Sequence, residues 1–343
     1  MRKLILVACL AAFTGCKDRS ARTDGPINDL VDVALNKDGP GPNDQPGSDE
    51  PNLKDHNELR QRGNSAFAGQ DFDQAIAWYS ASIEAKAEAK TYFNRGTAQM
   101  AKNDLPAALA DYDMAVQLDP KDASPLVNRG LLLQRMGKTA QGINDMTEAA
   151  KIDAKDASIL LNRGLLHLAI VMYDRAIADF NQALELNPKY GEAYINRGYC
   201  QYRKRSFRAA IRDFDAAIEL APLNPLAYSN RGNAYSQLED YDKALADFSE
   251  AIRLDARDSQ FYNNRGSAYG GKAEHRKAAA DFTRAIELSP DFAAAYRNRG
   301  HAHHALNEKA QARVDFERAL ELDAANSEGI PREYLTKVNA EKK

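Results

Sequence analysis

One stretch of the sequence contains residues whose types and spacing could bind a phosphate group. Gly266, Gly271 and Lys272 match the first part of the glycine-rich loop that cradles nucleotide phosphates. Ala273 stands where that loop needs a Ser or Thr to bind magnesium, and no strand is expected before it. We therefore interpret the match as coincidental, with Gly270 and Gly271 only softening a turn.

Histidines form the second candidate for chemistry. His301 and His304 lie three residues apart, on one face of a predicted helix, where both could bind a metal, while His303 between them takes a core position. Zinc sites use three or four protein ligands, and no Cys or further His recurs along the chain at a regular spacing, so solvated histidines are favoured. Gly-x-Ser-x-Gly, His-Glu-x-x-His and Cys-x-x-Cys motifs are absent from the sequence. We expect no enzyme activity, cofactor or metal, and a metal-dependent enzyme is the weakest alternative.

The stretch Asn-Arg-Gly organises the elements that must position any site. It recurs every 34 residues, starting at Asn94, Asn128, Asn162, Asn196, Asn230, Asn264 and Asn298. Such strict spacing indicates a structural repeat. In the clearest copy, residues 225–258, apolar and small residues recur at helical spacing in two runs, with Gly232 expected to face Ala244 and Ala251. The pattern predicts two amphipathic helices joined by a tight turn, neither of which can bury its apolar face alone.

This repeat resembles the tetratricopeptide repeat (TPR) consensus, in which an aromatic residue, Gly-x-x-Tyr, Ala-x-x-x-Phe and a closing Pro hold fixed places in 34 residues. The resemblance implies an all-α fold, a right-handed α-α superhelix (a solenoid) of about eight helix-turn-helix repeats. The expected repeats are 56–88, 89–122, 123–156, 157–190, 191–224, 225–258, 259–292 and 293–326, followed by a capping helix over 327–343. The sequence departs from the consensus where Arg precedes each glycine, because the family has an apolar residue there.

Two repeats differ from the others. The first has Gln61 in place of the asparagine and Trp78 where later repeats have Asp, as expected of a terminal unit. In the third, Gly142 replaces a helix alanine and Met146 replaces the aromatic residue. Since glycine costs a helix about 1 kcal/mol relative to alanine, we expect local opening to begin in the third repeat.

Each arginine of the Asn-Arg-Gly stretch has an aspartate sixteen residues later. An antiparallel helix pair brings these two places to nearly the same height, so each arginine could pair with an aspartate of its own or an adjoining repeat. The alternative, an arginine stripe that binds phosphate, is disfavoured because the aspartates would cancel its field. The expected ion pairs are Arg95 with Asp111, Arg129 with Asp145, Arg163 with Asp179, Arg197 with Asp213, Arg231 with Asp247, Arg265 with Asp281, and Arg299 with Asp315.

Charge and cysteine content exclude two further classes. The 343 residues carry a net charge of −3, or −5 once Arg2 and Lys3 are removed with a signal peptide, so no basic excess attracts nucleic acid. Cys200 is the one cysteine expected in the folded part, so no intramolecular disulfide is expected. A small buried residue is favoured there over a redox role, because several other repeats have alanine at the equivalent position.

The N-terminus has the pattern of a secretion signal. Two basic residues precede an apolar run of about ten residues, which is too short to span a bilayer. Cys16 directly after Thr-Gly resembles the lipobox of bacterial lipoproteins, which implies a cleaved signal peptide (1–15) and a lipidated cysteine. Residues 16–54, rich in Pro, Gly and Asp, would form a disordered tether. We expect a lipid-anchored cell-envelope protein, in the outer membrane and facing the periplasm; the alternative is a plain cleaved signal and a secreted or periplasmic protein.

The TPR resemblance also implies where a partner would bind, because first helices line the concave groove of the family. The asparagine column resembles the ladder that holds the backbone of an extended peptide, since an amide both donates and accepts; bracing between helices is the alternative. The same face is more apolar in repeats two to five than in repeats six to eight, which indicates an interaction surface there. The expected peptide-binding residues are Asn94, Asn128, Asn162, Asn196, Phe93, Val127, Leu131, Leu161, Leu165, Ile195 and Tyr199.

The leading hypothesis is a non-catalytic, membrane-tethered scaffold or adaptor that binds an extended peptide or a partner protein. A structural envelope protein that self-associates is the alternative, and the apolar turn at Ile170, Val171 and Met172 is the candidate edge for it.

Overall fold

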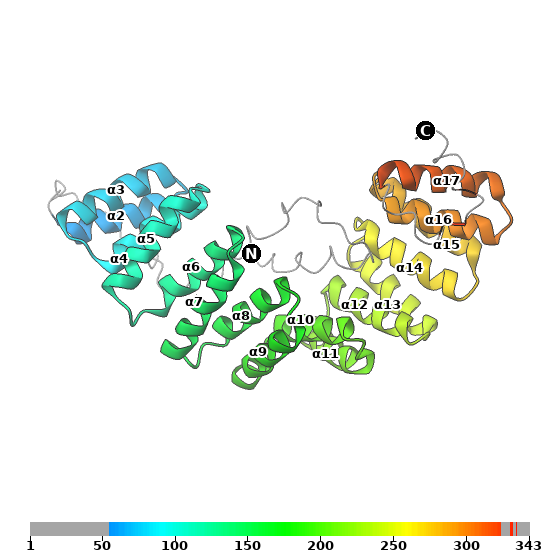
Figure 1. Ribbon diagram of the computed structural model, residues 1–343, viewed down its shortest axis with the longest axis horizontal. Coiled ribbons are helices and arrows are strands. Elements are labelled where there is room, and N and C mark those ends of the chain that lie inside the picture. Colours follow the sequence, from blue (N-terminus) through cyan, green and yellow to red (C-terminus); the bar gives the residue numbers. More distant parts are fainter. Residues whose placement is uncertain (1–54, 324–329, 332–333, 335–343) are drawn as a thin grey trace. The chain divides into compact units, whose positions relative to one another are not determined.

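The computed structural model describes residues 55–323, 330, 331 and 334. Regular structure in these residues is α-helical, with sixteen helices in eight consecutive antiparallel pairs (Figure 1). The all-α class and the helix-turn-helix repetition predicted from the sequence are therefore confirmed. The signal peptide, Cys16, the tether and most of the expected C-terminal cap lie outside the described residues. Within the described part of the chain, no helix is long and apolar enough to cross a membrane.

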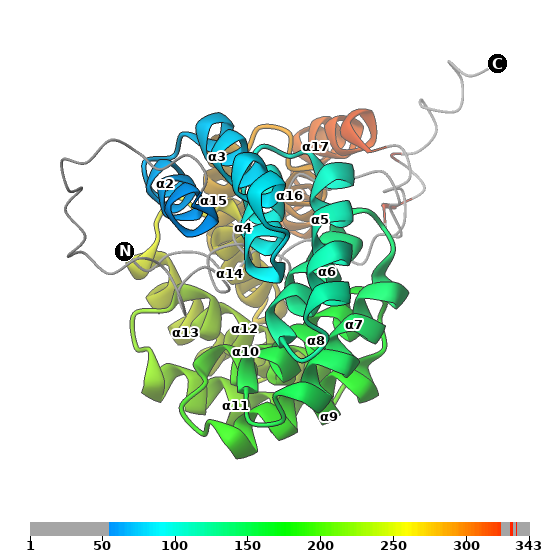
Figure 2. The ribbon, with the colours of Figure 1, turned by 90° about the vertical axis from the view of Figure 1, so that its left-hand side faces the viewer.

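The helices divide between two compact units, and the boundary in the chain lies between Pro188 and Lys189. In the first unit, each second helix also contacts the first helix of the next pair, so the pairs stack in chain order (Figure 2). Its helices are α2 (His56–Ala68), α3 (Phe72–Ala85), α4 (Ala89–Ala101), α5 (Leu105–Leu118), α6 (Ala123–Arg135), α7 (Thr139–Ile152), α8 (Ala157–Ala169) and α9 (Tyr173–Leu186).

The second unit repeats the same stacking of pairs. Its helices are α10 (Gly191–Arg203), α11 (Phe207–Leu220), α12 (Pro225–Gln237), α13 (Tyr241–Leu254), α14 (Ser259–Gly271), α15 (His275–Leu288), α16 (Ala293–Ala305) and α17 (Lys309–Leu322). Ile330 and Tyr334 are buried against Ala312, Phe316 and Leu320 of this last pair, at the place where the sequence predicts a cap.

Capping side chains and tight turns mark the ends of the helices. Asp122 and Asp156 accept hydrogen bonds from the backbone N–H groups of Ser124 and Ser158, both at 2.9 Å, and so cap the N-termini of α6 and α8. The turn inside every pair contains one residue at positive φ, a conformation that is unfavourable for residues other than glycine. These residues are Gln70, Asn103, Gly137, Val171, Arg205, Glu239, Ala273 and Asn307, with φ between 59° and 76°.

An aromatic ring fills the centre of most pairs. A Cβ atom on Gly232 would lie 2.9 Å from the ring of Phe248, so glycine is needed to admit this ring between α12 and α13. The ring of Phe248 is thus the nearest neighbour of Gly232, and the expected contact of Gly232 with Ala244 and Ala251 stays a prediction. Ala244 and Phe248 form a cluster with Ala268 of the following pair. The ring thus belongs to two pairs at once, which makes each pair dependent on its neighbour.

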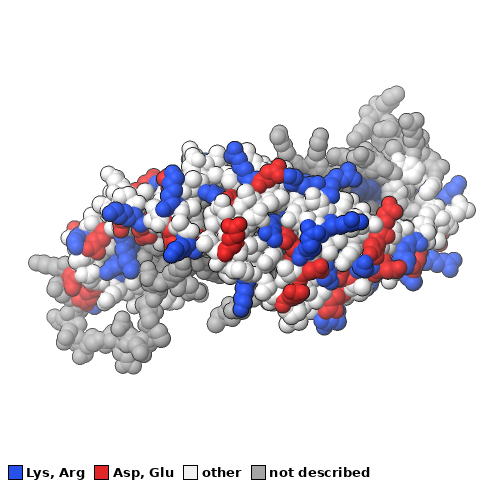
Figure 3. Space-filling view, turned by 90° about the horizontal axis from the view of Figure 1, so that it is seen from below, with Lys and Arg blue, Asp and Glu red and all other residues white. Residues whose placement is uncertain are grey.

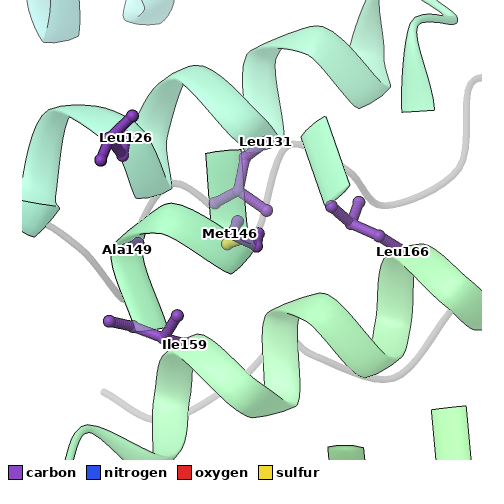
Figure 4. Close-up of a cluster of buried hydrophobic side chains, with 6 residues drawn as sticks. All are labelled: Leu126, Leu131, Met146, Ala149, Ile159 and Leu166. Carbon is purple, nitrogen blue, oxygen red and sulfur yellow. The ribbon is translucent and has the colours of Figure 1, made fainter. Parts of the chain in front are cut away.

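The third pair solves the same packing problem differently. Met146 replaces the ring, and α6 and α7 approach so closely that a Cβ atom on Gly142 would lie 2.5 Å from the carbonyl oxygen of Gly130. Met146 is fully buried in a cluster whose members are Leu126, Leu131, Ala149, Ile159 and Leu166 (Figure 4). Alanine does not fit at Gly142 without a backbone shift, so the glycine is required by the close approach. The propensity argument for local opening therefore does not hold at this residue.

The turn between α8 and α9 generates a stability prediction. Val171 is β-branched and 61% exposed at φ 62°, where an L-residue costs roughly 1–2 kcal/mol. Gly137 occupies the equivalent turn between α6 and α7. Because glycine is free of this strain, Val171→Gly should stabilise the protein by about 1 kcal/mol, measured as an upward shift of the urea midpoint. Gly137→Val is the matched reverse change and should lower the midpoint; a lower midpoint for Val171→Gly would contradict the account.

Candidate functional site

The asparagine column lies on the first helices and is mostly buried. Asn128, Asn162 and Asn196 are 8%, 6% and 5% exposed. Asn94 Nδ2 donates to Asn64 Oδ1 at 2.9 Å, which links α4 to α2. At the other end of the column, an equivalent 2.9 Å bond joins Asn298 of α16 to the α14 side chain Asn263. At both ends, therefore, the asparagines brace neighbouring first helices.

Folding explains several of the apolar residues predicted to line a groove. Leu131 packs between pairs against Met146, and Ile195 packs against Ala217 and Ala227. These two side chains are 9% and 5% exposed, so the expectation that they lie on a solvated face was wrong. The reason is that consecutive pairs approach closely enough for these side chains to fill the space between them.

The remaining residues of that predicted set vary in exposure. Leu161 and Tyr199 are each 3% exposed, so these two side chains do not lie on a solvated face either, and Leu165 is half-buried. Phe93 and Val127 are partly buried against the hydrophobic clusters of the second and third pairs. The binding role of the whole set stays a prediction.

An open pocket of about 340 Å³ lies on the first helices of the second unit. Amide and hydroxyl side chains from α12, α14 and α16 dominate its wall, and the lining contains no His, Cys, Asp or Glu. Arg297 is the charged residue of the lining, and the composition suits hydrogen bonding to polar groups rather than acid–base or metal chemistry. The polar lining residues include Asn233, Ser236, Gln260, Asn264, Ser267 and Asn298.

One atom in this wall calls for a ligand or a water molecule. The hydroxyl oxygen of Ser236 is buried and has no hydrogen-bond partner in the structure, and a buried polar atom left unpaired costs roughly 1–3 kcal/mol. Nearby amides are already ordered, since Gln260 Nε2 donates to Asn264 Oδ1 at 2.8 Å. Sequence reasoning missed this pocket, because it read the polar side chains of repeats six to eight as the less interactive face. Their amide and hydroxyl content was the signal available.

Each of the seven predicted ion pairs forms within its own helix pair. Arg95 is typical: its Nε and Nη2 atoms donate to the two carboxylate oxygens of Asp111, both at 2.8 Å. The aspartate side chains are 4% to 11% exposed and the arginines about 20%. Hydrogen bonding to Asp247 raises the pKa of the Arg231 guanidinium above its ordinary value. The arginines are thus held by carboxylates and do not form an open phosphate site.

Asp179 lies within hydrogen-bonding distance of a buried histidine as well as of its arginine. Arg163 donates to Oδ1 through both Nε and Nη2, while Nδ1 of the buried His167 lies 2.8 Å from Oδ2. The carboxylate therefore connects two side chains of α8 to α9, and it is 5% exposed.

The candidate chemical residues occupy packing positions. His301 stacks edge-on against Phe316 with ring centroids 5.0 Å apart, and burial lowers its pKa. His304 Nδ1 lies 3.1 Å from the hydroxyl of Tyr334. No group of three or more His, Cys, Asp or Glu residues in the described part of the chain is placed to hold a metal. Gly266 admits the ring of Phe282, and Cys200 is buried, so the structure gives a packing role to both.

Charged side chains of both signs are mixed on the surface, whereas one turn exposes three adjacent apolar side chains. On the face shown in Figure 3, Lys and Arg are interspersed with Asp and Glu rather than gathered into one basic patch. Ile170, Val171 and Met172 are 38%, 61% and 42% exposed in the turn between α8 and α9.

Burial raises the pKa of the Glu192 carboxyl, in the first turn of α10, to about 7. Nothing in the sequence alone singled out this last residue.

Sequence comparisons match most of the described chain to one family. Models described as tetratricopeptide repeat match residues 225–258, residues 95–167, and residues 60–123, 172–225 and 263–327. Sperm-associated antigen 1 of Mus musculus is 30% identical over 82 residues, 24% of this chain and 9% of that protein. Protein unc-45 homolog B of Xenopus tropicalis is 29% identical over 93 residues, 26% of this chain and 10% of that protein. The chain thus spans about a tenth of the length of these curated relatives.

Solved structures share the fold. A tetratricopeptide repeat protein from Parabacteroides merdae ATCC 43184 aligns with a TM-score of 0.55 at 22% identity, over 74% of this chain and 98% of that chain. The APC/C hetero-tetramer Cut9-Hcn1 aligns with a TM-score of 0.53 at 16% identity, over 73% of this chain and 56% of that chain. At these identities the likeness shows the fold alone.

The shared carboxylate of Asp179 generates a second prediction. Asp179→Asn removes the charge that faces half-buried Arg163 and buried His167, and breaking a buried pair costs about 3–5 kcal/mol. The loss, measured by urea unfolding, should exceed that of the control Asp281→Asn, which faces Arg265 without a histidine. The double change Arg163→Leu with Asp179→Leu should cost less than Asp179→Asn alone. Additive single and double effects would refute a desolvated pair.

Proposed function

Because the chain belongs to the tetratricopeptide repeat family, we propose that it is a non-catalytic scaffold that binds an extended segment of a partner protein on its first helices. The observation that carries the proposal is the polar pocket of the second unit, in which the Ser236 hydroxyl is buried without a partner. A scaffold of this kind needs no reacting group, only a surface that recognises polypeptide.

The chemistry of the pocket favours an extended backbone as the ligand. A peptide group presents one donor and one acceptor, and the side chains of Asn233, Asn264 and Asn298 can each provide both. The Ser236 hydroxyl would gain a hydrogen bond on binding, which removes the cost of leaving it unpaired. Recognition through the backbone tolerates different side chains, so affinity and specificity would come from separate parts of the surface.

Site-specific photo-crosslinking of the full chain in cells tests this surface. Benzoylphenylalanine at exposed Ser267 of α14 should form adducts with a partner protein, because Ser267 lines the pocket. Ala246, equally exposed on the second helix α13, is the matched control and should form none. Asn264→Leu should reduce the Ser267 adducts at least tenfold while the helical circular dichroism is retained. Equal adducts from both positions, or none from Ser267, would contradict the proposal.

We further propose that the scaffold is tethered to a bacterial membrane. The supporting observations are those of the sequence: a short apolar signal (1–15), Cys16 directly after Thr-Gly, and the Pro-, Gly- and Asp-rich residues 16–54. A diacylated Cys16 in the outer membrane would hold the repeats in the periplasm at the end of this tether. Two acyl chains are needed for a stable anchor, since one chain binds only marginally.

Cys16→Ser tests the anchor. Without the thiol no lipid can be attached, so the protein should move from the membrane pellet to the soluble fraction or remain uncleaved. Cys200→Ser is the control, because that cysteine is buried in α10, and it should leave fractionation unchanged. If Cys16→Ser stayed in the membrane with normal processing, the anchor would have to lie elsewhere.

Self-association is the second candidate function, favoured by one observation. Ile170, Val171 and Met172 expose three adjacent apolar side chains in a turn whose counterparts are mostly polar. Light scattering on the purified protein distinguishes a dimer built on this turn from a monomeric scaffold.

A further inference from the structure

A second pocket lies in the first unit, on helices other than those of the proposed backbone-binding surface. It measures about 310 Å³ and opens where α6 runs beside the second helices α5 and α7. Leu109 and Leu133 form its apolar part, and the exposed side chains of Asp113, Gln141 and Asn144 form its polar part. The ion pair of Arg129 and Asp145 completes the lining.

The polar framework of this pocket has a close counterpart within the second unit. Arg129 bridges two aspartates, because Nη1 donates to Asp113 at 2.8 Å while Nε and Nη2 hold Asp145. In the second unit, an arginine on α12 makes the same bridge: Arg231 Nη1 donates to Asp215 at 2.6 Å and Nη2 donates to Asp247 at 2.7 Å. The two places therefore share the same arrangement of one arginine between two carboxylates.

In the second unit, a tyrosine side chain stands at the place that corresponds to the pocket. Tyr235 stands there at the position of Leu133, and its ring packs beside the cluster formed by Ala244, Phe248 and Ala268. Lys243, at the position of Gln141, places its Nζ atom 5.2 Å from the centre of that ring. Burial raises the pKa of the Tyr235 hydroxyl.

The same pair of residue types fills the equivalent place in the next repeat. Lys277 Nζ lies 5.4 Å from the centre of the Tyr269 ring, at the positions that correspond to Gln141 and Leu133. The open volume in the first unit is thus the space that a tyrosine ring and a lysine occupy twice elsewhere in this chain.

A lysine accompanies the ring in both filled places. Lys243 Nζ also donates to Asp240 at 2.7 Å, so this lysine is paired with a carboxylate of its own helix end. In the first unit, Gln141 replaces the lysine, and the exposed carboxylate of Asp113 lies in the pocket lining. The pocket therefore lacks both the ring and the cation that lies against it, and an aromatic ring with a cation beside it would restore both.

We propose that this pocket binds an aromatic side chain, with a neighbouring lysine or arginine, from a partner protein. The ring would lie against Leu109 and Leu133. The cation would lie beside this ring, as Lys243 lies beside the Tyr235 ring, and close to the carboxylate of Asp113. The inference goes beyond the proposed backbone-binding site, because it uses other helices and a side chain rather than a backbone.

The occupant is a different protein rather than another part of this chain. Residues 17–54 contain no Phe, Tyr or Trp, so the segment between the signal and the repeats has no ring to insert. The large hydrophobic side chains exposed on the described surface are Leu, Ile, Val and Met, so a second copy offers no suitable ring among them.

Methyl NMR of the full chain, labelled at leucine, tests the proposal with a defined probe. N-acetyl-tyrosyl-lysine amide should shift the methyl signals of Leu109 and Leu133 and saturate. N-acetyl-alanyl-lysine amide should bind at least tenfold more weakly, because it lacks the ring. The double change Leu133→Tyr with Gln141→Lys introduces the residue types found at Tyr235 and Lys243. This filled variant should keep its helicity and should bind the tyrosyl probe at least tenfold more weakly than the unchanged protein.

A second variant keeps the pocket open and tests the charge. Asp113→Asn changes a side chain that is 55% exposed and should fold normally. The unchanged protein should bind N-acetyl-tyrosyl-lysine amide more tightly than N-acetyl-tyrosyl-alanine amide. In Asp113→Asn the two probes should bind with equal affinity. The proposal is overturned if no saturable shift appears at Leu133, if the alanyl probe binds as well as the tyrosyl probe, or if that preference survives in Asp113→Asn.

Discussion

A buried ion pair joins the two helices in seven of the eight helix pairs, at the place where the TPR consensus has an apolar residue. An arginine with its stem packed in the pair and its guanidinium on a carboxylate that is 4% to 11% exposed has little freedom to move. Two parallel hydrogen bonds also fix direction as well as distance, which an apolar contact does not. The pair therefore sets the height at which the two helices meet. A buried ion pair adds less to stability than to the choice of one arrangement, and here that choice is repeated seven times.

This constraint leaves other positions free to vary between repeats. The large side chain at the centre of a pair is Tyr, Phe or Met, and the spacing of the helices adjusts, most visibly where Gly142 meets Gly130. Beside the constant arginine, one place holds Tyr235 in one repeat, His167 in another and Leu133 in a third. The first gives a filled surface, the second a buried bond to Asp179, and the third an open pocket. A uniform frame with variable contents is how one repeat can present several different surfaces.

The sequence predicted those features that depend on regular spacing. The 34-residue period gave the helix pairs, and the sixteen-residue offset of Arg and Asp gave the ion pairs, because both follow from helix geometry alone. It failed where the answer depends on how closely two helices approach. Leu131 and Ile195 lie at face positions by periodicity, yet neighbouring pairs bury them. The pocket beside Leu133 is open because a smaller side chain stands where other repeats have tyrosine, and a pattern of residue types does not measure volume.

In solution, the seven arginines should be held by their own aspartates, with each Nε–H group donated to a carboxylate oxygen. The exchange of their Nε–H protons with water, measured by NMR on the full chain, tests this most directly. The account predicts seven slowly exchanging Nε–H signals that persist in 1 M salt, where exposed ion pairs are screened over distances beyond about 3 Å. The remaining arginines of the chain supply the internal reference. Exchange of all seven at the rate of those exposed arginines, or loss of the slow signals in salt, would contradict the claim.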